Sequence, residues 1–424
     1  MALIIVALAF GGFAVKQGRD WLALRAEIAA LRVRGEPLTF DELVTAYQAD
    51  AQGTDLTDRW LECCAIIGNA VRKSEDNNPY TETFLNEQAE TLSKLHELAV
   101  TDGSVRLPLV QDAETGFVRI ALWDTREGDS PNALALFRRS PPDDLLATCR
   151  CLAAEARLHA SRDDGAAAAR SLCAGLALTR TLEHVPCTIG LLQRCGLRNQ
   201  IYIVVKDLLP SGLFSAVDLA TLQSTLSQES DLAADCFWGF RGERVGGIAT
   251  FSIAWVKKDW LYRTWYYQSD KLAFLRAIQE SSDNLQLPYP QAVAAGEYWT
   301  IDEDIKGHLV TELLIPAVGA MRMAFAGTWA AGRVVVLAVA LTRYDRDHGK
   351  PPHQLADLVP NYLTELPTDP LFLAPFGYEV DPEGYTVFSP LKSYSFETRD
   401  PSTGFHKTML YRSRFQSPDT STPD

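Results

Sequence analysis

The chain has 424 residues, 47% of them hydrophobic, and a formal net charge of −14. This length allows two or three domains with a substantial core, and the apolar share excludes a largely disordered chain. The negative charge argues against a nucleic-acid-binding surface, which would show a basic stripe, so we expect no nucleic-acid partner.

The first predicted element is an apolar run, Ala2 to Val15 (ALIIVALAFGGFAV). A helix that crosses a bilayer needs about 20 apolar residues, so this run suits a signal-peptide core or a short membrane anchor. Gly12-Phe13-Ala14 is a candidate cleavage site made of small residues. The alternative is a buried N-terminal helix of a soluble protein. We predict that residues 1–35 form an anchor or signal segment and the helix that follows it.

That helix is predicted from Arg19 to Arg34, where Gly35 and Pro37 end it. Basic residues are frequent after the apolar run: Lys16, Arg19, Arg25, Arg32 and Arg34. Taken alone, these cations would place the body in the cytoplasm. Thr39 then caps a second helix, with Glu42 at the capping-box spacing.

Residues 36–330 are predicted to be a mainly helical body. Further helices are expected from Leu56 to Val71 and from Thr81 to Ala99, and a β-hairpin or irregular insert is expected from Val105 to Trp123. Four more helices follow, over Asp144–Ser161, Ala166–Glu183, Ile189–Leu209 and Ala216–Leu226. The stretch ARLHASRDDGAAAARSLCAGLALTRTLEHVP resembles part of a tetratricopeptide repeat. We favour a single helical hairpin within a bundle over a short repeat array, because no clear second copy follows.

Aromatic side chains are densest from Arg241 to Trp265, where Trp255, Trp260, Tyr262 and Trp265 lie among basic residues, and Tyr266 and Tyr267 follow directly. A membrane-surface or ligand platform is one interpretation, and core packing is the favoured one. Arg241-Gly242-Glu243-Arg244 is interpreted as a surface salt-bridge cluster, with a buried ion pair as the alternative. Leu285 to Tyr298 is expected to be rich in loops.

No motif identifies a catalytic, cofactor-binding or metal site, and we predict none. The seven histidines show no HExxH spacing, and the chain contains no CxxC, nucleophile elbow, Walker loop or GxGxxG. The acidic cluster from Thr300 to Asp304 is interpreted as a helix N-terminus rather than a cation site. The eight cysteines lie mostly on apolar helix faces, and Cys149 and Cys151 face different ways on one helix, so we expect at most one or two disulfides.

The C-terminal unit, residues 331–395, gives the clearest pattern. Apolar residues from Val334 to Tyr344 recur on one helix face, and Gly349 and two prolines stop the helix, where His348 is expected to cap carbonyls. A short second helix from His353 to Val359 and an extended loop follow. Two alternating strands around Asp381-Pro382-Glu383-Gly384 predict a hairpin. The residues before the helix are also apolar, so one long helix is expected to serve both units. Residues 396–424 are predicted to be a flexible tail.

This unit resembles the globular head of major pseudopilins of bacterial type II secretion. The resemblance rests on residues in a fixed order: Tyr344, His348-Gly349, Pro352, Leu355, Leu358, Pro360, Tyr362-Leu363, Pro367 and Asp369-Pro370. It covers about one seventh of the chain and implies a small α+β fold. The acidic calcium loop of that family is missing, because Pro390-Leu391-Lys392-Ser393 follows the hairpin. The whole chain also resembles a family of uncharacterised bacterial proteins with an N-terminal anchor and an RGEPLT-type segment, Arg34 to Thr39 here.

We therefore expect a mainly α fold, either a helical bundle or a short tetratricopeptide-like array, with a pseudopilin-like C-terminal module. The expected function is that of a non-catalytic, membrane-tethered scaffold or protein-interaction protein with an unidentified protein partner and no cofactor. The alternatives are a component of a secretion or pilus-like assembly and an enzyme whose site is assembled from scattered residues. The apolar N-terminus and the pseudopilin-like unit favour a body outside the cytoplasm. A concave groove on a helical surface would favour the binding protein, whereas a polar pocket with clustered Asp, Glu or His would favour the enzyme.

Overall fold

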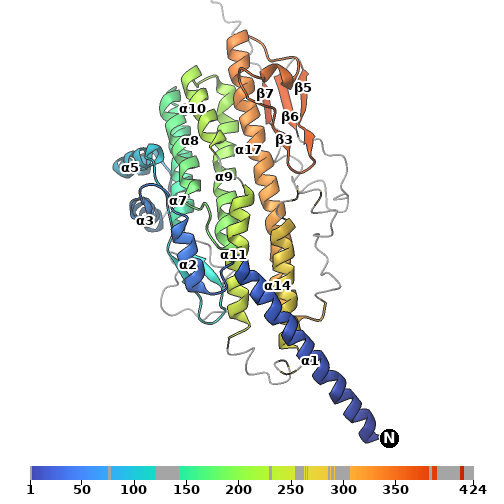
Figure 1. Cartoon of the computed structure of the whole chain (residues 1–424). Helices are drawn as coiled ribbons and strands as arrows, with labels where there is room; N and C mark the ends of the chain where they lie inside the picture. Colours follow the sequence, from blue (N-terminus) through green and yellow to red (C-terminus); the bar gives the residue numbers. More distant parts are fainter. Residues whose placement is uncertain are drawn as a thin grey trace, which may run out of the picture.

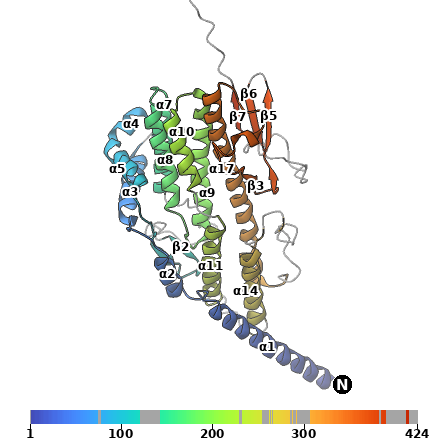
Figure 2. The ribbon, with the colours of Figure 1, turned by 45° about the horizontal axis from the view of Figure 1, so that its top comes forward.

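The computed structural model describes residues 2–74, 78–120, 143–228, 232–253, 262, 264, 266–284, 287, 291, 306–381, 384–388 and 411–414. The described chain is mainly helical, as predicted. Long helices run side by side through the body, a small sheet lies beside one end of the last long helix, and the first helix projects from the opposite end (Figure 1). Turning the molecule leaves the same arrangement visible (Figure 2).

The helices are α1 (Ala2–Val33), α2 (Phe40–Ala49), α3 (Thr57–Lys73), α4 (Glu82–Glu87), α5 (Ala89–Val100), α7 (Asp143–Ala160), α8 (Gly165–Arg180), α9 (Thr188–Leu208), α10 (Ala216–Ser227), α11 (Leu232–Thr250), α14 (Tyr267–Asp283), α16 (Leu309–Leu314) and α17 (Pro316–His348). Two short 3-10 helices are η2 (Leu209–Ser211) and η4 (Leu355–Leu358). The strands are β1 (Leu109–Gln111), β2 (Val118–Ile120), β3 (Thr368–Asp369), β4 (Ala374–Pro375), β5 (Gly377–Asp381), β6 (Gly384–Phe388) and β7 (Tyr411–Arg414).

Local signals in the sequence predict several of these boundaries correctly. Thr39 and Glu42 form the expected capping box at the start of α2, and Leu43 and Tyr47 are buried on its inner face. The predicted hairpin insert is present as the antiparallel pair β1–β2, although Trp123 lies outside the described residues. The single helix predicted from Thr81 to Ala99 is divided at Gln88 into α4 and α5.

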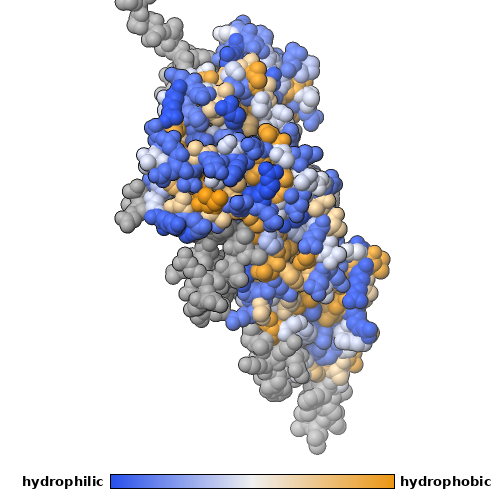
Figure 3. Space-filling model, turned by 90° about the vertical axis from the view of Figure 1, so that its left-hand side faces the viewer, coloured by the Kyte–Doolittle hydropathy of each residue, from blue (hydrophilic) through white to orange (hydrophobic). Residues whose placement is uncertain are grey.

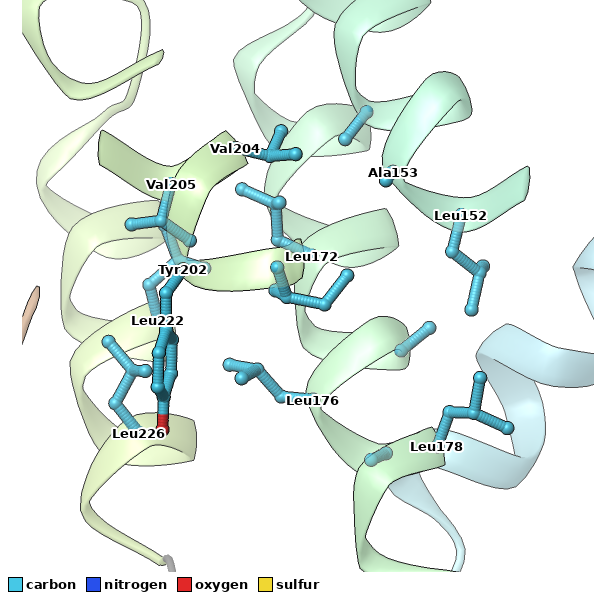
Figure 4. Packing of buried hydrophobic residues seen from close by; sticks show 14 of the residues in the cluster. Leu152, Ala153, Leu172, Leu176, Leu178, Tyr202, Val204, Val205, Leu222 and Leu226 are labelled. Atoms are coloured by element: carbon cyan, nitrogen blue, oxygen red, sulfur yellow. The ribbon is translucent and has the colours of Figure 1, made fainter. Parts of the chain in front are cut away.

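The middle of the chain folds into a bundle centred on α8. This helix is rich in small residues and packs against α5, α7, α9 and α10. Gly165 begins it at a point where a Cβ would lie 2.4 Å from the Leu213 carbonyl oxygen, so a side chain cannot be accommodated there without movement. Leucines of α8 meet side chains of α7, α9 and α10 on different sides (Figure 4). The run of alanines in α8 is explained by the close packing of the neighbouring helices around it.

Helix α17 is a single helix of 33 residues, about 50 Å long at 1.5 Å per residue. This confirms the prediction of one continuous helix that ends at Gly349, whose φ of 68° is left-handed. Its residues from Val334 to Leu341 are almost all buried, and it contacts α9, α10 and β6. Among the described residues, Ala324–His348 is the segment that is long and apolar enough to cross a membrane, and 67% of its most apolar window is buried inside the body. A mostly buried core helix of this length and composition meets the same criterion.

The C-terminal sheet has three strands in the order β5-β6-β7. The predicted hairpin pairs Gly377 with Phe388 and Asp381 with Gly384. Strand β7 lies within the stretch predicted to be a flexible tail, and that prediction is wrong for Tyr411–Arg414, which pair antiparallel with β6. The sequence YRSR does not alternate apolar and polar residues, so it does not predict a strand. Its strand conformation is explained by its pairing with β6.

A second core joins α1 to the body. Leu24 and Leu31 of α1 are buried with Phe240 of α11, Phe274 of α14 and Phe325 of α17. The main core lies at the other end, around α7, α8, α9, α10 and the central part of α17. Helices α9 and α17 contribute to both cores, so they connect the end that carries α1 to the end that carries the sheet.

The cluster from Arg241 to Arg244 is not the surface salt bridge that was favoured. Arg244 is fully buried and donates to Glu36 Oε2 at 2.6 Å, and Arg241 donates to the same oxygen at 3.2 Å. Burial lowers the pKa of Arg244, and the Glu36 carboxylate acts in the opposite direction. Glu36 belongs to the RGEPLT segment, far away in the sequence, so the pair could not be seen from the cluster alone.

Candidate interaction groove

A groove with a volume of about 760 Å³ lies between the end of α5, the second half of α8 and the outer side of α10. Figure 3 views the molecule from the side on which α3 and α5 lie in Figure 1, and hydrophobic residues reach this surface in several groups among hydrophilic ones. The groove is lined by Ala99, Val100, Thr101, Asp102, Cys173, Arg180, Ala216, Val217, Ala220, Thr221, Ser224, Thr225 and Gln228.

The walls of the groove expose apolar side chains to solvent. Val100 at the end of α5 is 86% exposed and Val217 on α10 is 73% exposed. Ala216 and Ala220 continue the exposed face of α10. Small side chains on a helix allow a second backbone to approach closely, and valines beside them supply apolar area. The surface is therefore suited to packing against another polypeptide segment.

Hydroxyl groups in the groove mostly bond to their own helix. Thr221 Oγ1 donates to the Val217 carbonyl at 2.9 Å, and Thr225 Oγ1 lies 2.9 Å from the Thr221 carbonyl and 3.4 Å from Cys173 Sγ. At the start of α10, Ser215 and Asp218 form a capping box. The hydroxyl donors of Thr221 and Thr225 are therefore used within α10, and the capping box fixes where the helix begins.

Arg180 supplies the positive charge in the groove. It is the last residue of α8, and its guanidinium donates to the Ala99 carbonyl and to Gln228 Oε1, both at 3.4 Å. The long distances indicate weak hydrogen bonds. The arginine thus joins the ends of α5 and α10, and its donors lie where an entering carboxylate or carbonyl could replace these contacts.

The lining of the groove does not fit a catalytic site. It contains neither His nor Glu, and its single carboxylate is Asp102 at the exposed end of α5. Desolvation raises the pKa of the half-buried Cys173 thiol, which favours its protonated form. The arrangement therefore provides shape, apolar contact and one cation, which are the features of a binding site.

None of the six described histidines lines this groove. His96 on α5 contacts Glu155 of α7 at 2.9 Å, and His159 lies 3.9 Å from the other oxygen of Glu155. His184 contacts Asp50 at 2.8 Å, where Arg106 also binds. These contacts tie neighbouring elements together, and among the described residues no group of three or more His, Cys, Asp or Glu has the geometry of a metal site.

The other described histidines are His308, His348 and His353. His348 bonds to the Tyr344 carbonyl at 2.9 Å and stacks on the Tyr344 ring at 4.0 Å, as expected for a residue that caps the end of α17. His308 precedes α16, and His353 is exposed near η4. His406 and the cluster from Thr300 to Asp304 lie outside the described residues.

All eight cysteines are free, so none of the one or two disulfides that we allowed for is formed. Burial raises the pKa of the Cys64, Cys149 and Cys187 thiols to about 12 and that of Cys195 to about 11. In the aromatic stretch, Tyr262 and Tyr267 pack in the second core, which agrees with the favoured interpretation, whereas Tyr266 is 54% exposed. Trp255, Trp260 and Trp265 lie outside the described residues.

The sequence did not point to the groove. Its two valines come from elements that are distant in the chain, and an exposed valine has no signature that separates it from a buried one. The alanines of α10 look like ordinary helix-forming residues. The feature of the sequence that could have indicated the groove is the low number of charged side chains on the outer face of α10.

Comparison with known proteins adds nothing to these residues: no protein-family model, curated protein or solved structure matches the chain.

Proposed function

We propose that this chain is a membrane-tethered, non-catalytic interaction protein that binds a protein partner in the groove formed by α5, α8 and α10. The observation that carries the proposal is the groove itself. It exposes Val100 and Val217 above a floor of small side chains, and it places the guanidinium of Arg180 between two helix ends. The partner segment that fits is short and apolar, with an acceptor group such as a carboxylate near Arg180.

The tether in this proposal is the N-terminal part of α1. The apolar residues from Ala2 to Val15 continue into one helix that ends at Val33. This helix packs against α14 over its second half and projects from the body at its N-terminal end (Figure 1). An apolar helix end that projects away from the body favours insertion into a membrane.

The experiment that tests the groove compares proteins that co-purify with the detergent-solubilised chain and with two variants. Ala220→Trp fills the groove, and Ile203→Trp adds the same side chain at an exposed position of α9 outside it. Both positions are exposed, so each variant should fold with a small change in stability. We expect a partner that is retained by wild type and by Ile203→Trp and lost from Ala220→Trp. The same co-purifying proteins in all three samples would contradict the proposal.

We further propose that residues 331–395 form a pseudopilin-like module and that the body lies outside the cytoplasm. The support is the order of matching residues together with the packing of α17 against β6. A reporter that is active only in the cytoplasm, fused after Asp424, should be inactive. Activity of that reporter would contradict the location and would agree with the basic residues that follow the apolar run.

A further inference from the structure

Helix α1 has a second apolar face that no described residue covers. Its inner face carries Leu24 and Leu31, which pack in the second core with α14. On the opposite side, Val15 is 73% exposed, Leu22 62% and Val33 89%. At 3.6 residues per turn these three lie on one line along the helix, together with the exposed small residues Gly18, Ala26 and Ala29. We call these six residues the outer face of α1.

Basic side chains border the outer face on both sides. Arg19 lies along one border and Arg25 and Arg32 along the other, all exposed. Among the described residues, no carboxylate lies within ion-pair distance of these three arginines. Trp21 is 44% exposed on the same border as Arg25, whose guanidinium lies 4.7 Å from the Trp21 ring centre.

The two acidic residues of this part of α1 are already engaged. Asp20 is buried and pairs with Lys16 at 3.4 Å. Glu27 lies 3.7 Å from Arg34 and 4.0 Å from Arg276. The surface that α1 presents to the outside is therefore cationic on a chain whose net charge is −14. Such a local reversal of sign favours an anionic partner.

We infer that the outer face of α1 lies against an anionic lipid surface. An apolar line with arginines and a tryptophan at its borders is the pattern of a helix that lies in the headgroup region, where the arginine side chains reach the phosphates while their aliphatic parts stay in apolar surroundings. The same helix begins with the apolar run Ala2 to Val15. A second copy of α1 fits less well, because a parallel pair would bring the bordering arginines of one copy close to those of the other.

The inference rests on the proposed tether, and vesicle flotation distinguishes a failure of the inference from a failure of the tether. Full-length chain is diluted from detergent into vesicles of phosphatidylcholine alone, or of two parts phosphatidylcholine to one part phosphatidylglycerol. We expect the partition coefficient to be at least about tenfold higher on the anionic vesicles, and the difference to shrink at high salt. Equal flotation with both kinds of vesicle would overturn the inference and leave the tether intact. Flotation with neither would overturn both.

Two variants with the same change in net charge locate the effect. The α1 variant carries Arg19→Glu, Arg25→Glu and Arg32→Glu and should lose the preference for anionic vesicles. The control carries Arg59→Glu, Lys73→Glu and Lys350→Glu, which are exposed and lie outside α1, and it should keep the preference. Loss in both variants, or in neither, would overturn the inference. If the α1 variant does not fold, the lipid and salt dependence of the wild type decides the matter.

A dimer in detergent that Leu22→Asn converts to a monomer would assign the outer face to a second copy instead.

Discussion

Glu36 follows the end of α1 and joins that end to α11. Its carboxylate accepts from Arg244, which is fully buried, and from Arg241. Removing the anion leaves a buried guanidinium without its charge partner, which is costly. We predict that Glu36→Gln lowers the free energy of unfolding by about 3 kcal/mol, measured by chemical denaturation.

The matched control is Glu27→Gln on the same segment. Glu27 is partly exposed and its two ion pairs are long, at 3.7 Å and 4.0 Å. Its replacement should change the free energy of unfolding by less than about 1 kcal/mol. Equal effects of the two substitutions would show that burial of the Glu36 pair is not what stabilises this junction.

Asp55 gives a prediction about pH. Its Oδ1 accepts from the Thr57 amide at 2.9 Å at the start of α3, and hydrogen bonds from the side chain and backbone of Thr57 lower the pKa of Asp55. A carboxylate whose pKa is lowered by folding stabilises the folded state above its unfolded pKa, near pH 4, and this contribution is lost as the pH falls through the lowered folded value. Because Asp55 is exposed and solvent screens its interactions, Asp55→Ala should cost less than about 1 kcal/mol near neutral pH.

The same measurement at decreasing pH checks the sign. The difference between wild type and Asp55→Ala should shrink below about pH 4 as the carboxyl group takes up a proton. Asp58→Ala, in the first turn of the same helix, should show a much smaller difference at every pH. A difference for Asp55→Ala that grows in acid would mean that the hydrogen bonds to Thr57 do not favour the charged form.

At the scale of elements, α17 is the helix that holds the C-terminal sheet to the bundle. Leu341 is fully buried in the main core, in a helix that contacts α9, α10 and β6. Leu341→Asp would place an unpaired charge there, at a cost of several kcal/mol. We predict that limited proteolysis then opens the Pro367–Tyr385 region while the Asp144–Leu226 helices stay protected.

Two controls accompany this variant. Leu341→Met keeps the volume and should be cut like wild type. Lys350→Asp adds the same carboxylate at an exposed position just after the helix and should also be cut like wild type. Cleavage of Leu341→Asp at the wild-type rate would show that α17 does not join the sheet to the bundle.

The elements also show what a single sequence can predict. The start of α2 and the end of α17 follow from local chemistry, because Thr39, Glu42 and Gly349 act on backbone groups within one helical turn. The three features that were missed or misjudged need distant partners: β7 pairs with β6, Glu36 binds Arg244, and the groove brings α5 beside α8 and α10. Pattern and propensity carry no information about which distant segments meet, so these features required the structure.

For the whole molecule, we predict that no divalent metal is needed for folding. Glu155 lies between His96 and His159, and among the described residues no group of three or more His, Cys, Asp or Glu could hold a metal ion. A metal that contributed to stability would be linked to folding, and a chelator would then lower the melting temperature. We expect the melting temperature to be the same with and without a chelator. A marked decrease would show that a metal site had been missed.

Photo-crosslinking in cells from the rim of the groove gives the sharpest test of whether the groove binds a protein. A photoreactive amino acid replaces Val217, which is 73% exposed and lines the groove, and a parallel sample carries it at Ile203, which is 44% exposed and does not. We expect a discrete adduct with a second protein from position 217, and Ala220→Trp should abolish it. No such adduct should form from position 203. No adduct from position 217, or the same adduct from both positions, would contradict a protein-binding groove.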